Sequence, residues 1–243
     1  MNRKKKLLIL LMLSLSVFFV YKLTDETKII YTVIGDYYSN GENSYGGYTY
    51  GYEDYFLDYL KRNNQVEFND LYTSKNQSIN TLYNTYLKDE TKIIDNKNYN
   101  LKKILTESKV ITISIGLNDI IYEHNINKNG FNSQYIEDKT IEYIYNNFKN
   151  LMNEILKYST NNIYILGYPE RNSNYKSLIS KLNIKYKEFC NKEKLTFIDS
   201  NKILNKEKYF DIEDSIFPNT SGYKKIAQKI IEIYKNKEKA WNN

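Results

Sequence analysis

Short apolar runs rich in β-branched residues recur along this chain, and longer stretches with a helical apolar period separate them. A continuous apolar run of this kind is typical of a strand that is buried on both faces of a parallel sheet. The pattern predicts five strands, at residues 29–35, 66–68, 110–116, 162–167 and 195–199.

Four stretches between and after these runs carry apolar residues at the spacing of one helix face. They predict helices at residues 52–60, about 137–158, about 175–193 and 222–236. Because strand and helix alternate without a repeat or a second composition regime, we expect one doubly wound α/β domain, residues 29–236, with a five-stranded parallel sheet. Function is then expected in the loops at the carboxyl ends of the strands.

The N-terminus has the pattern of an export signal. Residues 1–6 are a basic stub, residues 7–21 a largely apolar run, and residues 22–28 a polar linker, while residues 237–243 at the other end form a polar tail. We interpret the run as an uncleaved signal-anchor helix in the cell membrane, with the stub in the cytoplasm and the domain extracytoplasmic. The run is short for a span of about 20 residues, so a cleaved signal and a secreted protein are the alternative.

The net charge of +6 lies mostly outside the domain. Residues 1–28 hold six basic and two acidic side chains, so they carry +4 and leave +2 for the rest. A nucleic-acid binder is expected to keep a basic surface on its folded domain, so we expect no nucleic-acid partner. The single histidine and single cysteine exclude a His-rich or Cys-cluster metal site, and no metal or cofactor is expected.

Three loops at the expected site carry motifs. Gly35-Asp36-Tyr37 ends the first strand, Gly116-Leu117-Asn118-Asp119 ends the third, and Asp214-x-x-Phe217-Pro218-Asn219-x-x-Gly222-Tyr223 leads into the last helix. In this order and at these separations, the blocks resemble the SGNH (GDSL-type) hydrolase family over about residues 29–234. The resemblance implies a flavodoxin-like fold and, for an intact member, hydrolysis of carboxylic esters.

Two catalytic positions of that family are replaced here. The resemblance places the nucleophilic serine at Tyr37, the general-base histidine at Phe217 and the retained triad aspartate at Asp214. Of the oxyanion donors, the asparagine is kept as Asn118 and the glycine is replaced by Asn76. Phenylalanine cannot accept a proton, and a tyrosine, with a pKa of about 10, needs an adjacent base to act as a nucleophile. We therefore expect a pseudoenzyme in which the Tyr37 and Phe217 rings pack edge to face and fill the former cleft.

A rearranged hydrolase site is the alternative. Ser39 lies two residues after the nucleophile position and His124 follows shortly after Asn118, so the two are candidates for a new serine–histidine pair. The chain would then be an active extracytoplasmic esterase, deacetylase or lipase. A lone histidine in a polar loop is more often simply solvated, which favours the inactive interpretation.

A long loop, residues 37–52, is rich in Tyr, Gly, Ser and Asn, as recognition surfaces often are. Exported members of the resembled family often deacylate cell-surface glycans, so the expected ligand is an envelope or cell-wall carbohydrate or an acylated polymer. Two other interpretations are that these tyrosines, among 26 in the chain, only pack on the first helix, or that a closed cleft scaffolds a protein partner. The candidate ligand-binding residues are Asp36, Tyr37, Tyr38, Tyr45, Tyr48, Asn118 and Phe217.

Overall fold

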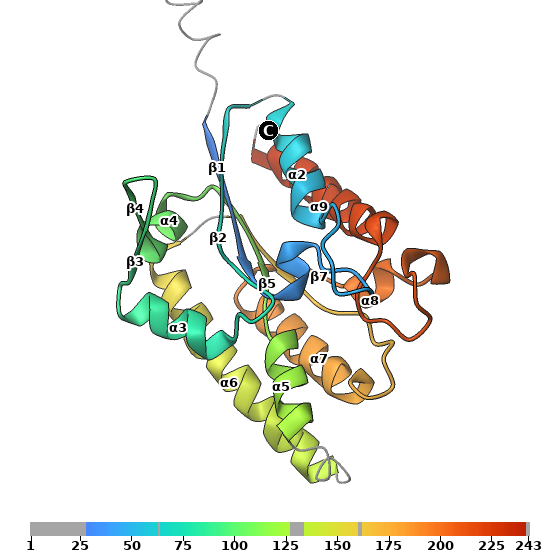
Figure 1. The fold of residues 1–243 in the computed structure, drawn as a ribbon. Helices are drawn as coiled ribbons and strands as arrows, with labels where there is room; N and C mark the ends of the chain where they lie inside the picture. Colours follow the sequence, from blue (N-terminus) through green and yellow to red (C-terminus); the bar gives the residue numbers. More distant parts are fainter. Residues whose placement is uncertain (1–27, 63, 127–133, 160–161, 242–243) are drawn as a thin grey trace, which may run out of the picture.

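The computed structural model describes residues 28–62, 64–126, 134–159 and 162–241. Its centre is a five-stranded parallel sheet with the strand order β2-β1-β5-β6-β7 (Figure 1). The predicted doubly wound α/β sheet is thereby confirmed. The strand order reverses between β1 and β5, and ligands of such sheets bind at the carboxyl ends of the strands on either side of this point. The strands are β1 (Ile29–Gly35), β2 (Val66–Thr73), β5 (Val110–Ser114), β6 (Asn162–Leu166) and β7 (Thr196–Ile198).

Helices cover both faces of the sheet (Figure 1). On one face α2 (Tyr52–Lys61) packs along α9 (Thr220–Trp241). On the other face α6 (Gln134–Tyr158) packs against three helices, α3, α4 and α7. The remaining helices are α3 (Ile79–Leu87), α4 (Leu101–Glu107), α5 (Leu117–Ile126), α7 (Lys176–Lys192) and the short α8 (Ser200–Ile203).

Many tyrosines of this chain belong to the core. Between the sheet and α2, Phe56 meets Tyr31 and Tyr164 edge to face, with ring centroids 5.1 and 6.3 Å apart. On the opposite face Phe148 stacks on Tyr186 at 4.0 Å. Aromatic pairs of this kind contribute roughly 0.5–1.5 kcal/mol each beyond the area that they bury. A tyrosine in this sequence is therefore not by itself a sign of a binding surface.

The structure differs from the predicted elements in several places. Strand β2 continues past the expected residues 66–68 to Thr73, and the sequence pattern does not predict the helices α3, α4, α5 and α8. Helix α9 continues to Trp241 through the segment expected to be a polar tail, and Lys237 from this segment donates a hydrogen bond to Thr196 Oγ1 of β7 (2.7 Å). The third strand ends at Ser114, because the positive φ of Gly116 (112°) turns the chain into α5. An antiparallel hairpin, β3 (Thr91–Ile94) and β4 (Lys97–Asn100), comes before α4, and the sequence pattern does not predict it.

The predicted basic stub, the apolar run at residues 7–21 and the linker up to residue 27 lie outside the described residues. Within the part of the chain that the structure does describe, no helix is long and apolar enough to cross a membrane.

Candidate functional site

Asp36 is buried at the switch point, where it links the end of β1 to the end of β5 and to the start of α5. Its backbone N–H donates to Ser114 O at the end of β5 (2.7 Å), and its Oδ2 accepts hydrogen bonds from Leu117 N (2.8 Å) and Asn118 N (3.1 Å) at the start of α5. The Tyr168 hydroxyl donates to the same carboxyl group (3.2 Å). Complete burial raises the pKa of Asp36 to about 7, against the lowering effect of these N–H donors.

Tyr37 follows directly in the short 3-10 helix Tyr37–Asn40, and its ring contacts that of Phe217. The ring centroids are 5.2 Å apart and the planes are tilted by 50°, so the expected contact forms but it is not edge to face. Both rings are partly buried. Burial and then the charge of Asp36 raise the pKa of the Tyr37 phenol, which makes its nucleophilic phenolate form rarer still at neutral pH.

Asp214 is hydrogen-bonded to the loop after β6. Its carboxylate accepts hydrogen bonds from Ser173 N and Ser173 Oγ (3.3 Å each), and its backbone carbonyl accepts one from the Asn172 amide (3.1 Å). The Phe217 backbone N–H instead bonds Ser215 Oγ (2.9 Å). The side chain expected to orient a histidine therefore has its partner in another loop.

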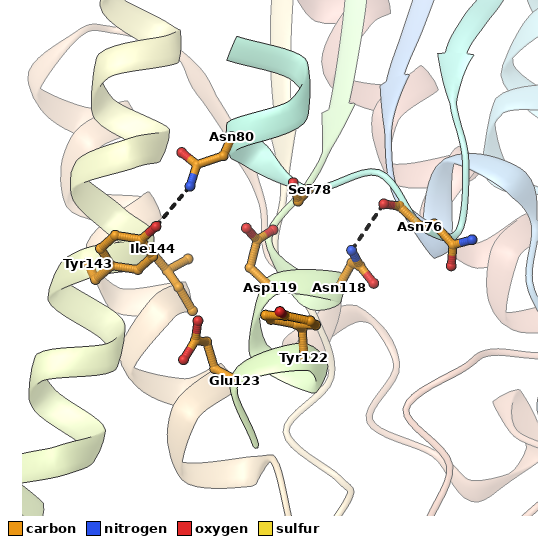
Figure 2. Close-up of a pocket in the computed structure, with 9 residues that line it drawn as sticks. All are labelled: Asn76, Ser78, Asn80, Asn118, Asp119, Tyr122, Glu123, Tyr143 and Ile144. Atoms are coloured by element: carbon orange, nitrogen blue, oxygen red, sulfur yellow. Dashed lines mark hydrogen bonds between the residues drawn. The ribbon is translucent and has the colours of Figure 1, made fainter. Parts of the chain in front are cut away.

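Asn118 and Asn76, the two predicted oxyanion positions, lie together. The Asn118 side-chain amide donates to the Asn76 backbone carbonyl (3.2 Å), as Figure 2 shows. An amide held this way offers one N–H fewer to a developing negative charge. The bond links the start of α5 to the loop that precedes α3.

A cavity of about 370 Å³ opens beside this bond, between α3, α5 and α6 (Figure 2). Asp119 and Glu123 come from one face of α5, and Tyr143 comes from α6. Asp119 accepts hydrogen bonds from Ile79 N at the start of α3 (3.2 Å), and burial raises its pKa to about 6, with a smaller contribution from the Glu123 charge. The full lining is Asn76, Ser78, Asn80, Asn118, Asp119, Tyr122, Glu123, Tyr143 and Ile144.

Sequence reasoning found only the two asparagines at the edge of this cavity, Asn76 and Asn118. The spacing of Asp119 and Glu123, one helical turn apart, is a signal that could have indicated a common face. Tyr143 carries no such signal, because it reaches the cavity only through the packing of α6 against α3.

The structure does not bring Ser39 and His124 together. Ser39 is buried, and its Oγ donates to Ile34 O (3.0 Å) in β1. The His124 ring packs edge to face on Tyr175, with centroids 4.9 Å apart. Since a nucleophile has to reach both its base and the substrate, this arrangement provides no serine–histidine pair.

The candidate ligand-binding residues in and next to the loop at residues 37–52 differ in their exposure. Tyr45 and Tyr48 are 73% and 63% exposed and are open to a ligand. Tyr38 and Asp36 differ from the expectation, because both are completely buried and present no surface to a ligand; the Tyr38 hydroxyl donates to Ile216 O (2.6 Å). Ser44 fixes the loop to the segment before α9 through Ser215 Oγ (2.8 Å).

A family model described as GDSL-like Lipase/Acylhydrolase matches residues 31–230. The match covers most of the chain and includes all three sequence blocks, so this chain belongs to the GDSL-like lipase/acylhydrolase family. No curated protein matches the sequence.

Solved structures share the fold. The lipase Lip_vut3 from a goat rumen metagenome has a TM-score of 0.68 at 14% identity, covering 84% of this chain and 96% of that one. A catalytic mutant of Axe2, an acetylxylan esterase from Geobacillus stearothermophilus, scores 0.61 at 14% identity, covering 84% and 93%. An extracellular lipase from Streptomyces rimosus scores 0.58 at 13% identity, covering 84% and 98%. At these identities the likeness establishes the fold.

Proposed function

We propose that this chain is a catalytically inactive member of the family that binds a carbohydrate or acylated polymer of the cell envelope. Its N-terminal pattern of basic stub and apolar run supports a place at the outer face of the membrane. A role as scaffold for a protein partner is the second form of the same proposal, and the exposed Tyr45 and Tyr48 serve either form.

The contact between Tyr37 and Phe217 carries the proposal. In Axe2, structures of catalytic mutants replace a serine, an aspartate and a histidine, and the aspartate precedes the histidine by three positions. Asp214 precedes Phe217 by the same spacing, and the separation between Tyr37 and Asp214 is one position longer than that between the Axe2 serine and its aspartate. Two rings in mutual contact thus stand where a nucleophile and a base would be required, and neither supplies the missing proton transfer.

The active alternative has less support. A rearranged site would need Ser39 to leave its bond with Ile34 O and emerge from the core, and His124 to leave Tyr175. Asp119, with a pKa raised to about 6 by burial, is mostly ionised at neutral pH, but it already accepts the N–H of Ile79. The described residues therefore offer no ready substitute for the family's dyad.

A hydrolysis assay of the full chain tests this proposal. We expect acetate release from 4-nitrophenyl acetate and from acetylated xylo-oligosaccharides to equal the rate in buffer alone. The family's catalytic groups typically supply several orders of magnitude in rate, so an active site would be easy to detect. Turnover that disappears in Tyr37→Phe or in His124→Ala would contradict the proposal and identify the residue responsible.

A further inference from the structure

A second cavity, of about 310 Å³, lies where α8 and the 3-10 helix Glu207–Tyr209 pack against α9. Four lysines line it, two from α8 and the turn after it and two from α9. Its volume falls in the range of small-ligand sites, roughly 300–1,000 Å³. The full lining, which we call the lysine groove, is Lys202, Ile203, Asn205, Lys206, Tyr209, Lys225, Gln228, Lys229 and Glu232.

The lysine groove concentrates the positive charge of the domain. Its four lysines and Glu232 give the nine lining residues a net charge of +3, whereas residues 29–243 together carry only +2. The rest of these residues therefore sum to a slightly negative charge. A concave surface with one sign of charge raises the local concentration of the opposite ion, so the groove is the part of the domain that attracts an anion.

Two of the four lysines have no acidic partner in the described ranges of the chain. Lys206 and Lys225 are exposed, and neither forms an ion pair there. The other two each pair with one carboxylate, Lys229 with Glu232 (2.8 Å) and Lys202 with Asp199 (3.8 Å). Both pairs are open to solvent, and such pairs are weak. An anionic ligand can therefore engage the lysines without displacing a strong internal contact.

The spacing of the lysines favours a chain of negative charges. Lys225 and Lys229 are one turn apart on the same face of α9, about 6 Å along the helix axis. Lys202 and Lys206 supply a second pair from the neighbouring segment. A flexible polymer with repeated charges matches these successive cations better than a single small anion does.

The chemistry of the lining favours phosphate groups without nucleic-acid bases. Lysine binds phosphate as a point charge and lacks the planar fork with which arginine pairs with a carboxylate in bidentate fashion. Tyr209 is the one aromatic residue of the nine, and it is only 8% exposed, so the groove offers no ring on which a base could stack. Asn205 and Gln228 can pair with hydroxyl groups between the phosphates.

We propose that the lysine groove binds a linear polymer of alcohol phosphates, a phosphodiester chain without bases, at the outer surface of the cell. The choice of an envelope polymer rests on the proposed place of the chain outside the membrane. None of residues 37–52 lines the groove, so this site is distinct from the loop that carries Tyr45 and Tyr48. A polymer bound here would hold the domain in the envelope.

Calorimetric titration of the full chain, in a nonionic detergent, with a synthetic hexamer of glycerol phosphate tests the inference. The double variant Lys206→Gln, Lys225→Gln removes the two lysines that have no acidic partner. We expect it to bind the hexamer at least tenfold more weakly. The slope of log affinity against log salt concentration should also become less steep by roughly 1.4, about 0.7 for each lost phosphate contact.

A matched control separates the groove from general charge attraction. Lys61→Gln together with Lys187→Gln removes the same charge from exposed positions on α2 and α7. We expect this control to keep the affinity of the original chain. Matching thermal unfolding midpoints of all variants show that the fold is retained.

The remaining titrations examine the kind of anion. Equal affinity of the two double variants overturns the inference, and so does a glycerol phosphate monomer or a poly-L-glutamate of equal charge that binds as tightly as the hexamer. Tighter binding of a thymidine oligonucleotide would assign the groove to nucleic acid and also overturn it. Failure of the hexamer to bind overturns this inference alone, because ester hydrolysis is measured separately and decides the proposed loss of catalysis.

Discussion

At the scale of single residues, the site depends on how Gly35 and Asp36 end the first strand. Gly35 has a φ of 138°, a region that favours glycine, and it brings the chain against Ser114 of β5. This close approach places the Asp36 carboxyl group at the start of α5, where it accepts two backbone N–H bonds. Tyr37 is then directed toward Phe217. The positions of Asp36 and Tyr37 in the candidate site thus depend on the backbone conformation of Gly35.

Gly35→Ala should therefore be strongly destabilising. A Cβ atom at this position would lie 1.8 Å from Ser114 O, so backbone has to move, and the φ angle adds strain. We expect the free energy of unfolding in urea to fall by about 3 kcal/mol or more. Gly47→Ala is the matched control, since its Cβ would approach no atom closer than 3.6 Å, and its effect should stay within about 0.5 kcal/mol. Equal effects of the two substitutions would refute this explanation.

At the scale of elements, the central strands and the four helices with long apolar stripes could be predicted, whereas the shorter helices α3, α4 and α5 and the exposed hairpin could not. The runs that became β1, β5 and β6 are continuously apolar because both of their faces are covered. The β3–β4 hairpin has mostly exposed residues, among them Ile93 at 72%, so burial imposed no pattern on it. The last helix extends past its apolar stripe to Trp241, and Lys237 in this part donates a hydrogen bond to β7.

Only part of the candidate site could be predicted from the sequence. The Tyr37–Phe217 contact could be predicted, because two motif positions that meet at one edge of the sheet remain neighbours whatever residues occupy them. The bond of Asp214 to Ser173 could not, since the partner lies in a loop without a motif. The same holds for Tyr143, which the packing of α6 brings to the cavity.

At the scale of the whole molecule, three buried carboxyl groups couple stability to pH. Burial raises the pKa of Asp36 to about 7, of Glu53 to about 8 and of Asp119 to about 6. Their ordinary values are 3.8 for aspartate and 4.5 for glutamate. Between these ordinary values and the raised ones, the folded protein holds protons that the unfolded chain has released. The free energy of unfolding is then greatest near the acidic end of this window.

We accordingly expect urea unfolding to show a more stable protein at pH 5 than at pH 8. Each carboxyl group that is protonated only in the folded state contributes about 1.4 kcal/mol per pH unit. Glu53→Gln should reduce this slope, because the amide stays neutral at every pH, and it should raise stability at pH 8. Stability that stays level or increases from pH 5 to pH 8 would show that these groups are ionised in the folded state.

The account depends most on the claim that Tyr37 and Phe217 stand in place of a nucleophile and its base on an otherwise retained hydrolase scaffold. The direct test is the full chain carrying Tyr37→Ser and Phe217→His together, assayed on 4-nitrophenyl acetate beside both single variants. We predict a kcat/KM at least tenfold above that of the original chain and of either single variant, because serine and base act only as a pair. The bond of Asp214 to Ser173 should keep this gain well below that of a complete triad. A folded double variant that hydrolyses the ester no faster than the original chain would contradict the claim.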